Sequence, residues 1–188
     1  PGGRDGPLSL LSIGSVGPRK AHELLVDALA GLTEVPWHLT IVGDILRHPL
    51  HVEKVRAVIA KHGLGERVTL TGGIGQKALE AHWQSTNVYV ASSRHEGYGM
   101  AIAEALSRAI PVVSTDAGAV GEWVDREAVR LVPTGDLTAL REAFGAVLKD
   151  ARVRERMREA AKNARTALPT WSAQASRVDA KLQALVSD

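Results

Sequence analysis

Short apolar runs alternate along the whole chain with segments whose apolar residues recur at helical spacing. The apolar runs cover residues 8–14, 38–44, 67–72, 87–93, 110–116 and, more weakly, 128–133. Runs this short, without regular polar positions, are typical of strands buried on both faces, and intervening helices make neighbouring strands parallel. We therefore predict an α/β fold: a doubly wound parallel sheet of about six strands with helices on both faces.

The segments between these runs predict the helices. Residues 20–31, 51–63 and 76–83 show helical apolar spacing, and a further helix is expected after Gly99. Three helices are expected after the last strand, because their apolar residues also follow a helical period. The first begins with Asp136 as its N-cap, the second stops before Pro169, and the third carries a stripe from Trp171 to Leu185.

The ends of the chain differ in composition from its middle. The sequence opens "PGGRDGPLSL", in which proline and glycine dominate before the first apolar run. We interpret residues 1–7 as a linker, residues 8–168 as one domain, and residues 169–188 as a separate C-terminal helix. The chain does not begin with methionine, so we expect it to be part of a longer protein.

Composition narrows the class of protein. The content of hydrophobic residues is 45% and cysteine is absent, which indicates a globular core and excludes disulfides and thiolate metal sites. A formal charge of +2 is too small to indicate a nucleic-acid partner. The sequence shows neither the roughly 20 consecutive apolar residues of a transmembrane segment nor a signal peptide. We expect a cytoplasmic protein.

The seven histidines are scattered, with no pair at H-x-x-x-H spacing and no grouped carboxylates beside them. Metal sites need several ligands brought together at short spacings. We therefore expect no metal site and no bound cofactor. The G-x-S-x-G nucleophile elbow is also missing from the sequence.

Glycine-rich turns follow four of the expected strands: "GSVGPRK", "GGIG", "EGYG" and "DAGAVGE". In an open parallel sheet, ligands bind beyond the carboxyl ends of the strands. Glycine lets a backbone approach such a ligand closely. Taken alone, each turn is better explained as an ordinary tight turn.

The stretch "HEGYGMAIAEAL", residues 95–106, carries the most information. The N–H groups of Gly99, Met100 and Ala101 open the expected helix, and a helix N-terminus attracts phosphate. Glu96 and Glu104 flank this start, and a carboxylate accepts hydrogen bonds from a sugar diol. Together these features fit a sugar nucleotide. Alternatively, Glu104 is an exposed helix residue that pairs with Arg108 at i+4.

Arg19 and Lys20 stand where the helix of residues 20–31 is expected to begin. The macrodipole disfavours cations at a helix N-terminus by a few tenths of a kcal/mol up to about 1 kcal/mol. A nearby diphosphate would reverse that preference. The other interpretation is a solvent-exposed pair tolerated at small cost.

A rival pattern lies in "GGIGQKA". Gly73, Gly75 and Ala78 match the dinucleotide fingerprint G-x-G-x-x-A between a strand and a helix. Glu96 lies a plausible distance downstream for a ribose-binding acid. The fingerprint, however, normally follows the first strand of its unit, whereas two expected strands precede this copy.

The motifs occur in the order typical of one family. The stretch "SRHEGYGMAIAEALSRAIPVVSTDAGAVGE" resembles the donor-binding region of glycosyltransferase family 4, the retaining enzymes of GT-B fold, whose hallmark is E-x7-E beginning with "EGFG". Glu96 and Glu104 have that spacing. The segments "SIGSVGPRKAHELLVDAL", "LTIVGD", "RVTLTGGI" and "LVPTGDLTALREA" resemble the rest of the domain in the same order.

The resemblance implies a role for each matching residue. Lys20 binds the donor diphosphate, Glu96 contacts the transferred sugar, and Glu104 holds the ribose hydroxyls. The remaining implied donor contacts are the amides of Met100 and Ala101 with Gly99 before them, the turn residues Gly14, Ser15 and Arg19, and Gly73 and Ile74 near the base. Glu122 matches a family glutamate to which we assign no role.

The sequence also departs from the family pattern. Ser15 replaces an arginine that contacts the diphosphate, and Arg19 could compensate only from a different position. Ser92 replaces a proline, and Ala119 replaces the second glycine of a Gly-Gly turn. These departures bear on donor affinity more than on the fold.

The family fold has two Rossmann-like domains, and this chain resembles only the second. The resemblance implies the donor-binding half of a retaining glycosyltransferase, with a nucleoside-diphosphate sugar as donor and an N-terminal domain as partner. Residues 169–188 would form the helix that crosses to that partner. The base, the sugar and the acceptor stay open, as does peripheral membrane attachment of the full-length enzyme. Two alternatives remain: an NAD(P)-binding domain using Gly73, Gly75 and Ala78, and a non-catalytic nucleotide-binding module.

Overall fold

The computed structural model describes residues 6–167, and within them the chain forms six strands and seven helices. The strands are β1 (Leu8–Ile13), β2 (Trp37–Val42), β3 (Val68–Gly72), β4 (Val88–Ala91), β5 (Val112–Thr115) and β6 (Val129–Val132). The helices are α1 (His22–Ala30), α2 (Pro49–Lys61), α3 (Gln76–Ser85), α4 (Met100–Ser107), α5 (Val120–Trp123), α6 (Leu137–Lys149) and α7 (Ala151–Ala167).

All six strands are parallel and run in the order β3-β2-β1-β4-β5-β6. The order reverses between β1 and β4, so the chain winds outward from the middle of the sheet in both directions. This confirms the predicted doubly wound parallel sheet. Such a reversal leaves a crevice at the carboxyl ends of the two central strands, because their helices leave on opposite faces.

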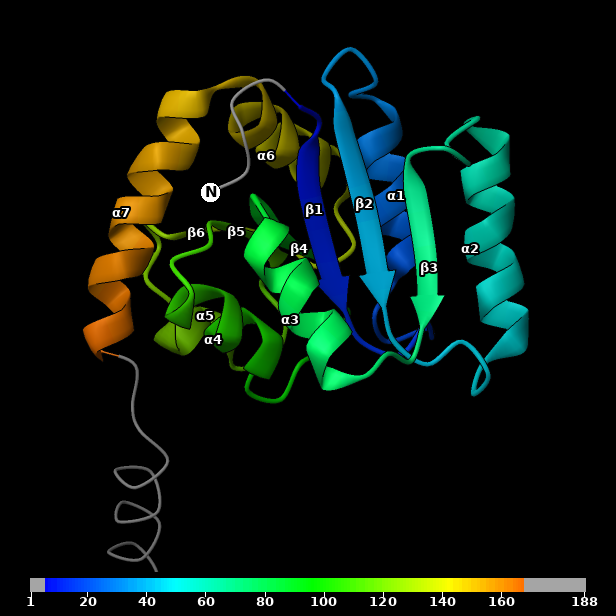
Figure 1. The fold of residues 1–188 in the computed structure, drawn as a ribbon, viewed down its shortest axis with the longest axis horizontal. Coiled ribbons are helices and arrows are strands. Elements are labelled where there is room, and N and C mark those ends of the chain that lie inside the picture. The colour runs from blue at the N-terminus through cyan, green and yellow to red at the C-terminus, as the bar shows by residue number, and fades with distance from the viewer. Residues whose placement is uncertain (1–5, 168–188) are drawn as a thin grey trace, which may run out of the picture.

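Two apolar layers sandwich the sheet (Figure 1). One layer packs α1, α2 and α6 around Leu25, Leu29 and Phe144, and the other packs α3, α4 and α5 around Ile102 and Leu106. Helix α7 joins them, since it contacts both α4 and α6. Strands covered on both faces need no polar positions, which explains the unbroken apolar runs of the sequence.

Local details confirm some of the predicted boundaries and correct others. The Oδ1 atom of Asp136 accepts a hydrogen bond from the amide of Ala139 at 2.9 Å, so the expected N-cap of α6 is confirmed. Helix α1 begins at His22, not at Lys20, because Ala21 has a left-handed backbone conformation with φ of 49°. Arg19 and Lys20 therefore lie in the turn before the helix. The short helix α5 was not predicted, and the helix expected from Trp171 lies outside the described residues.

Candidate functional site

The crevice opens where the two central strands stop pairing. Register between β1 and β4 covers Leu10 with Val88 and Leu11 with Tyr89. Further along, the amide of Ile13 donates to the side-chain hydroxyl of Tyr89 at 3.4 Å. The turn after β1 and the turn after β4 therefore face each other across this opening, as the sheet order requires.

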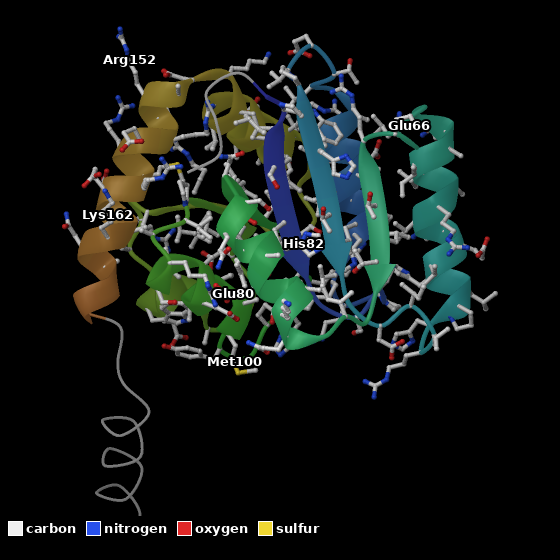
Figure 2. The ribbon with its side chains drawn as sticks, in the orientation of Figure 1. Glu66, Glu80, His82, Met100, Arg152 and Lys162 are labelled. Atoms are coloured by element: carbon white, nitrogen blue, oxygen red, sulfur yellow. The ribbon has the colours of Figure 1, made fainter. Side chains whose placement is uncertain are left out.

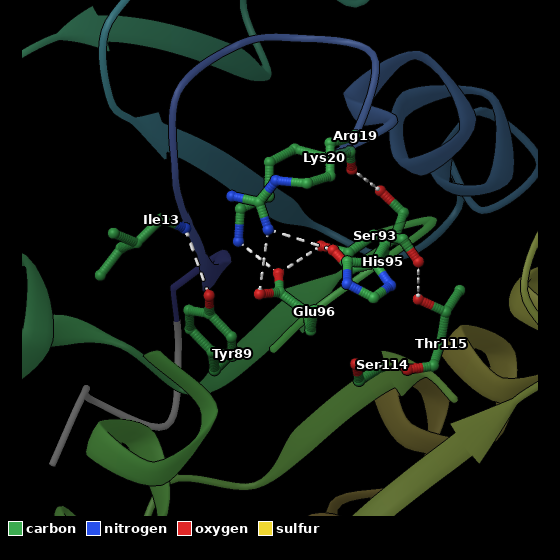
Figure 3. Close-up of polar contacts among 10 residues, drawn as sticks. Ile13, Arg19, Lys20, Tyr89, Ser93, His95, Glu96, Ser114 and Thr115 are labelled. Atoms are coloured by element: carbon green, nitrogen blue, oxygen red, sulfur yellow. Dashed lines mark hydrogen bonds and ion pairs between the residues drawn. The ribbon is translucent and has the colours of Figure 1, made fainter. Parts of the chain in front are cut away.

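Lys20 and Glu96 meet across the opening (Figure 3). Their side chains form an ion pair between Nζ and Oε1, and each is only about one-eighth exposed. The Lys20 side chain packs directly over the backbone of Gly14. A Cβ at Gly14 would lie 2.5 Å from the Cε atom of Lys20, so a larger residue would block this position of the side chain. The two residues are 76 positions apart in sequence, so the fold brings these two predicted site residues together.

Two more groups hold the Glu96 carboxylate. The hydroxyl of Ser93 donates to Oε1 at 2.6 Å, and Arg19 Nη1 lies 3.4 Å from Oε2. Arg19 also donates to the carbonyl of His95 at 3.1 Å, while its side chain stays 53% exposed. Arg19 is therefore at the site, with its guanidinium at the solvent-facing rim.

Burial and these partners act on the pKa of Glu96 in opposite directions. Burial raises the pKa, whereas hydrogen bonds from Lys20 and Ser93 and the charges of Lys20 and Arg19 lower it. The net effect holds the pKa of Glu96 below its usual value of 4.5. At neutral pH the site thus contains a buried carboxylate with two cations beside it.

Helix α4 begins on the same side of the sheet. Gly99 precedes it in a left-handed conformation with φ of 82°, which glycine adopts without strain. The amides of Met100 and Ala101 donate to no protein acceptor within residues 6–167. Met100 is 69% exposed, and Figure 2 shows it at the rim toward which the strands point. These N–H groups are consequently open to an outside acceptor.

Glu104 lies further along α4. Its Oε1 atom pairs with Arg108 at 3.1 Å, and Arg108 also pairs with Glu80 of α3 at 2.8 Å. The i+4 pairing that the sequence offered as an alternative therefore exists, although the Glu104 side chain remains 40% exposed. Burial raises the pKa of Tyr89, the hydrogen bond with Ile13 lowers it, and the charges of Glu96 and Glu104 both add to the rise, so both acids act on the same hydroxyl.

The rival dinucleotide pattern lies elsewhere. Gly73 and Gly75 follow β3, the edge strand of the sheet, and not a central strand. A Cβ at either position would meet nothing within 4 Å. Neither glycine lies close to another part of the described chain, and the turn lies away from the point where the strand order reverses. Ile74 packs partly buried against the α3–α4 layer.

Ser15 lies in the turn after β1, between the residues that contact the next turn along the sheet. The amide of Val16 donates to the carbonyl of Asp44 at 2.8 Å, and the amide of Gly14 donates to Val42. Ser15 is partly buried and adds no charge at a position where the family pattern has arginine. Among the turn residues, Arg19 and Lys20 therefore supply the positive charge.

Two further residues contact the turns of the candidate site: Ser92, noted above only as a departure from the family pattern, and Thr115, which the sequence did not indicate. Ser92 is buried, and its hydroxyl donates to the carbonyls of Lys20 and Ala21 at 3.0 and 2.9 Å. Thr115 Oγ1 donates to the carbonyl of Ser93 at 2.6 Å. Both hydroxyls stand at the end of an apolar strand run, and that position is the signal that could have marked them.

Within residues 6–167, no group of three or more histidine, aspartate or glutamate side chains is placed to hold a metal ion. None of the helices in that range is both long and apolar enough to span a bilayer.

Comparison with known proteins assigns this chain to a family. Residues 2–164 match the family described as "Glycosyl transferases group 1". The lipopolysaccharide core biosynthesis mannosyltransferase LpsB of Rhizobium meliloti is 30% identical over 144 residues, which cover 73% of this chain and 40% of that protein. The phosphatidyl-myo-inositol mannosyltransferase of Mycobacterium leprae is 34% identical over 143 residues, covering 74% of this chain and 36% of that protein.

Solved structures agree on the fold. A sucrose-phosphate synthase from Thermosynechococcus elongatus superposes with a TM-score of 0.83 at 26% identity, over 97% of this chain and 46% of the other. The C-terminal domain of a glycosyl transferase group 1 protein from Francisella tularensis gives 0.78 at 19% identity, over 87% and 86%. An Anabaena protein solved with UDP and glucose gives 0.77 at 22% identity, over 86% and 43%.

The chain therefore spans about 40% of the length of these two curated relatives and nearly all of an isolated C-terminal domain. The match covers both turns of the crevice and every strand of the sheet. This chain belongs to the glycosyl transferases group 1 and has the Rossmann-like architecture of a GT-B C-terminal domain.

Proposed function

We propose that this chain is the donor-binding half of a retaining glycosyltransferase and that it binds a nucleoside-diphosphate sugar in the crevice between β1 and β4. One observation carries the proposal. The unpartnered amides at the start of α4 lie at the same crevice as the paired side chains of Lys20 and Glu96. N–H donors and a cation suit a diphosphate, and a carboxylate beside them suits a sugar hydroxyl.

Each group then has a chemical task. As the bond to the transferred sugar breaks, negative charge builds on the leaving diphosphate. The amides of Met100 and Ala101 and the ammonium of Lys20 stabilise that charge, which is electrostatic catalysis by groups already in position. Arg19, at the exposed rim, adds a second cation that approaches from the solvent side.

The two acids hold the sugars at either end of the diphosphate. Glu96 accepts hydroxyl hydrogen bonds from the transferred sugar, and its low pKa keeps it ionised for that purpose at neutral pH. Glu104 accepts the ribose hydroxyls through the part of its carboxylate that remains exposed beside Arg108. Gly73 and Ile74, after β3, lie along the same edge of the sheet for contact with the base.

The relatives support the donor class. LpsB and the Mycobacterium leprae protein are named as mannosyltransferases, and the Anabaena protein binds UDP and glucose. Retention of anomeric configuration follows from the family resemblance of the E-x7-E segment. A partner domain N-terminal to this one supplies the acceptor site, so we expect this chain alone to bind nucleotide weakly and to transfer no sugar.

Calorimetry on this chain with UDP, GDP and ADP tests the proposal. Weak binding of at least one of the three is expected, and Lys20→Met should weaken it about tenfold because the cation that faces the diphosphate is lost. No heat with any of the three at millimolar concentration would contradict the proposal.

The alternatives give different results in the same experiment. Thermal protection by NADH but not by UDP or GDP would support the dinucleotide-binding alternative. The non-catalytic module is favoured by one observation, the missing cation at Ser15. Ser15→Arg should strengthen diphosphate binding if the crevice is functional, whereas continued absence of binding would indicate a site that has lost its function.

A further inference from the structure

The turn between β5 and α5, residues 116–119, together with α5 itself, contacts the turn after β4 almost residue by residue. The amide of Ala119 donates to the carbonyl of Gly97 at 3.4 Å. Val120 packs against Gly99, where a Cβ would lie 3.0 Å from its Cγ2 atom. The turn that carries the open amides is therefore held by contacts with a second turn, separate from it in sequence.

Gly118 is the closest point of this support. Its backbone has φ of 62°, and a Cβ there would lie 1.7 Å from the carbonyl oxygen of Glu96. A side chain at position 118 is incompatible with the present path of the turn after β4. The backbone contact fixes where Glu96 lies and leaves the following residues, Gly97 to Gly99, to be fixed by other contacts.

Trp123 supplies the contacts to Tyr98. Its indole N–H donates to the carbonyl of Tyr98 at 2.8 Å, and its ring stacks on the Tyr98 ring with centroids 4.7 Å apart and planes 9° from parallel. Tyr98 stands between two glycines, which have the greatest backbone freedom of any residue. One side chain therefore holds both the ring and the carbonyl of the residue that precedes Gly99.

We infer that Trp123 is a positioning residue for the diphosphate site. It fixes the Tyr98 carbonyl, so the peptide planes that follow, with the amides of Met100 and Ala101, point into the crevice before the ligand arrives. This inference rests on the proposed function, because the role assigned to Trp123 is to pre-order amides that bind phosphate. A site ordered in advance binds more tightly, since less freedom is lost on binding.

A matched pair of variants separates positioning from general stability. Trp123→Phe keeps an aromatic ring against Tyr98 and removes the N–H donor. Trp37→Phe removes the same kind of bond elsewhere, because Trp37 is buried and its indole donates to the carbonyl of Leu32 at 2.9 Å. Both proteins are compared with the wild-type chain for urea stability and for binding of the nucleoside diphosphate that wild type prefers.

We expect Trp123→Phe to bind that diphosphate about tenfold more weakly, with little change in stability. Trp37→Phe should be less stable and should bind with wild-type affinity. Wild-type affinity in Trp123→Phe, or an equal loss of affinity in Trp37→Phe, would overturn the inference.

Amide relaxation in the ligand-free proteins gives a readout that does not depend on binding. Tyr98, Gly99 and Met100 should be as rigid as the sheet in wild type and in Trp37→Phe, and mobile on the ps–ns timescale in Trp123→Phe. Rigid amides in all three proteins would contradict the inference. If wild type binds no nucleotide although this ordering is seen, the proposed function has failed and the phosphate role of Trp123 fails with it.

Discussion

The two turns that form the crevice contribute different kinds of polar group. The turn after β1 contributes side-chain charge, from Arg19 and Lys20. The turn after β4 contributes backbone N–H groups at the start of α4 and one carboxylate, Glu96. Side-chain charge sits at the end of flexible bonds, whereas backbone dipoles point wherever the turn directs them.

This difference leads us to expect that the two turns tolerate change differently. In the turn after β1, the arginine of the family pattern is Ser15, and Arg19 approaches from another position with the same charge. The turn after β4 keeps "EGYG" and depends on the turn of residues 116–119 and on α5, from which Gly118 and Trp123 respectively contact its backbone. A charged side chain can reach the site from a different residue, whereas backbone N–H groups point at the site only if the turn keeps the same conformation.

The largest expected effect comes from disturbing that backbone path. Gly118→Ala places a Cβ against the carbonyl of Glu96 and forces alanine to a φ of 62°. We expect a loss of about 3 kcal/mol in the free energy of unfolding, from overpacking and left-handed strain together. Urea unfolding measures it.

Gly97→Ala is the control, because a Cβ at Gly97 meets nothing within 4 Å. It lies in the turn after β4 itself and should change the stability by no more than about 0.5 kcal/mol. Equal losses in the two variants would show that the turn after β4 is sensitive to any side chain and is not held by Gly118.

The second-largest expected effect is a loss of stability at low pH that arises from His22, the first residue of α1. Burial, followed by the charges of Lys20 and His51, lowers the pKa of His22 from 6.5 to about 3. Neither ring nitrogen of His22 has a hydrogen-bond partner among the described residues. The unfolded chain therefore binds a proton that the folded chain excludes, so stability is lost as the pH falls from 6.5 toward 3.

Between pH 7 and pH 5 this single group should cost about 2 kcal/mol of unfolding free energy. Denaturation of wild type and His22→Gln at both pH values measures the difference. The variant should lose about 2 kcal/mol less than wild type over that interval, and parallel losses would mean that His22 titrates normally in the folded protein.

Removing one charge from each of the two turns should change the affinity for a nucleoside diphosphate in opposite directions. Lys20→Met removes the cation and should weaken nucleoside-diphosphate binding about tenfold. Glu96→Gln removes the competing negative charge and should strengthen it about threefold, because Lys20 is then free for the phosphates. Calorimetry with the diphosphate alone separates these effects from contacts to the sugar, and two changes of the same sign would contradict the pairing of Lys20 with Glu96.

The smallest effect concerns the start of α1. Ala21 has a φ of 49°, which strains a residue with a Cβ. Ala21→Gly should stabilise the protein by up to about 1 kcal/mol. Ala60→Gly, at an exposed position in α2, should instead destabilise it by about 1 kcal/mol. Thermal unfolding checks both, and a loss of stability in Ala21→Gly would mean that packing of the Ala21 methyl outweighs its strain.

The sheet could be predicted because the patterns that specify its strands and helices lie within short stretches of sequence. Apolar runs give the strands, the helices between them make the strands parallel, and a parallel sheet places its ligand at the carboxyl edge. Residues 96–101 could be marked as a site for the same reason, since glycine turns and helix starts are local patterns. The N-cap Asp136 is a signal of the same kind.

The contacts at the proposed site join residues far apart in sequence. The pairing of Lys20 with Glu96, and the bonds from Ser92 to Lys20 and Ala21, join residues more than 70 positions apart. Trp123 gave no periodic signal, because α5 is only four residues long. The left-handed Ala21 was also hidden, since alanine within an apolar helical pattern predicts helix.

The central claim is that the start of α4 binds the diphosphate, and amide NMR during a titration with GDP or UDP tests it most directly. The signals of Gly99, Met100 and Ala101 should show the largest shifts, and Lys20→Met should reduce them. Saturating shifts at Gly73 to Ala78 with none at Met100 and Ala101 would place the nucleotide at the edge strand and contradict the account.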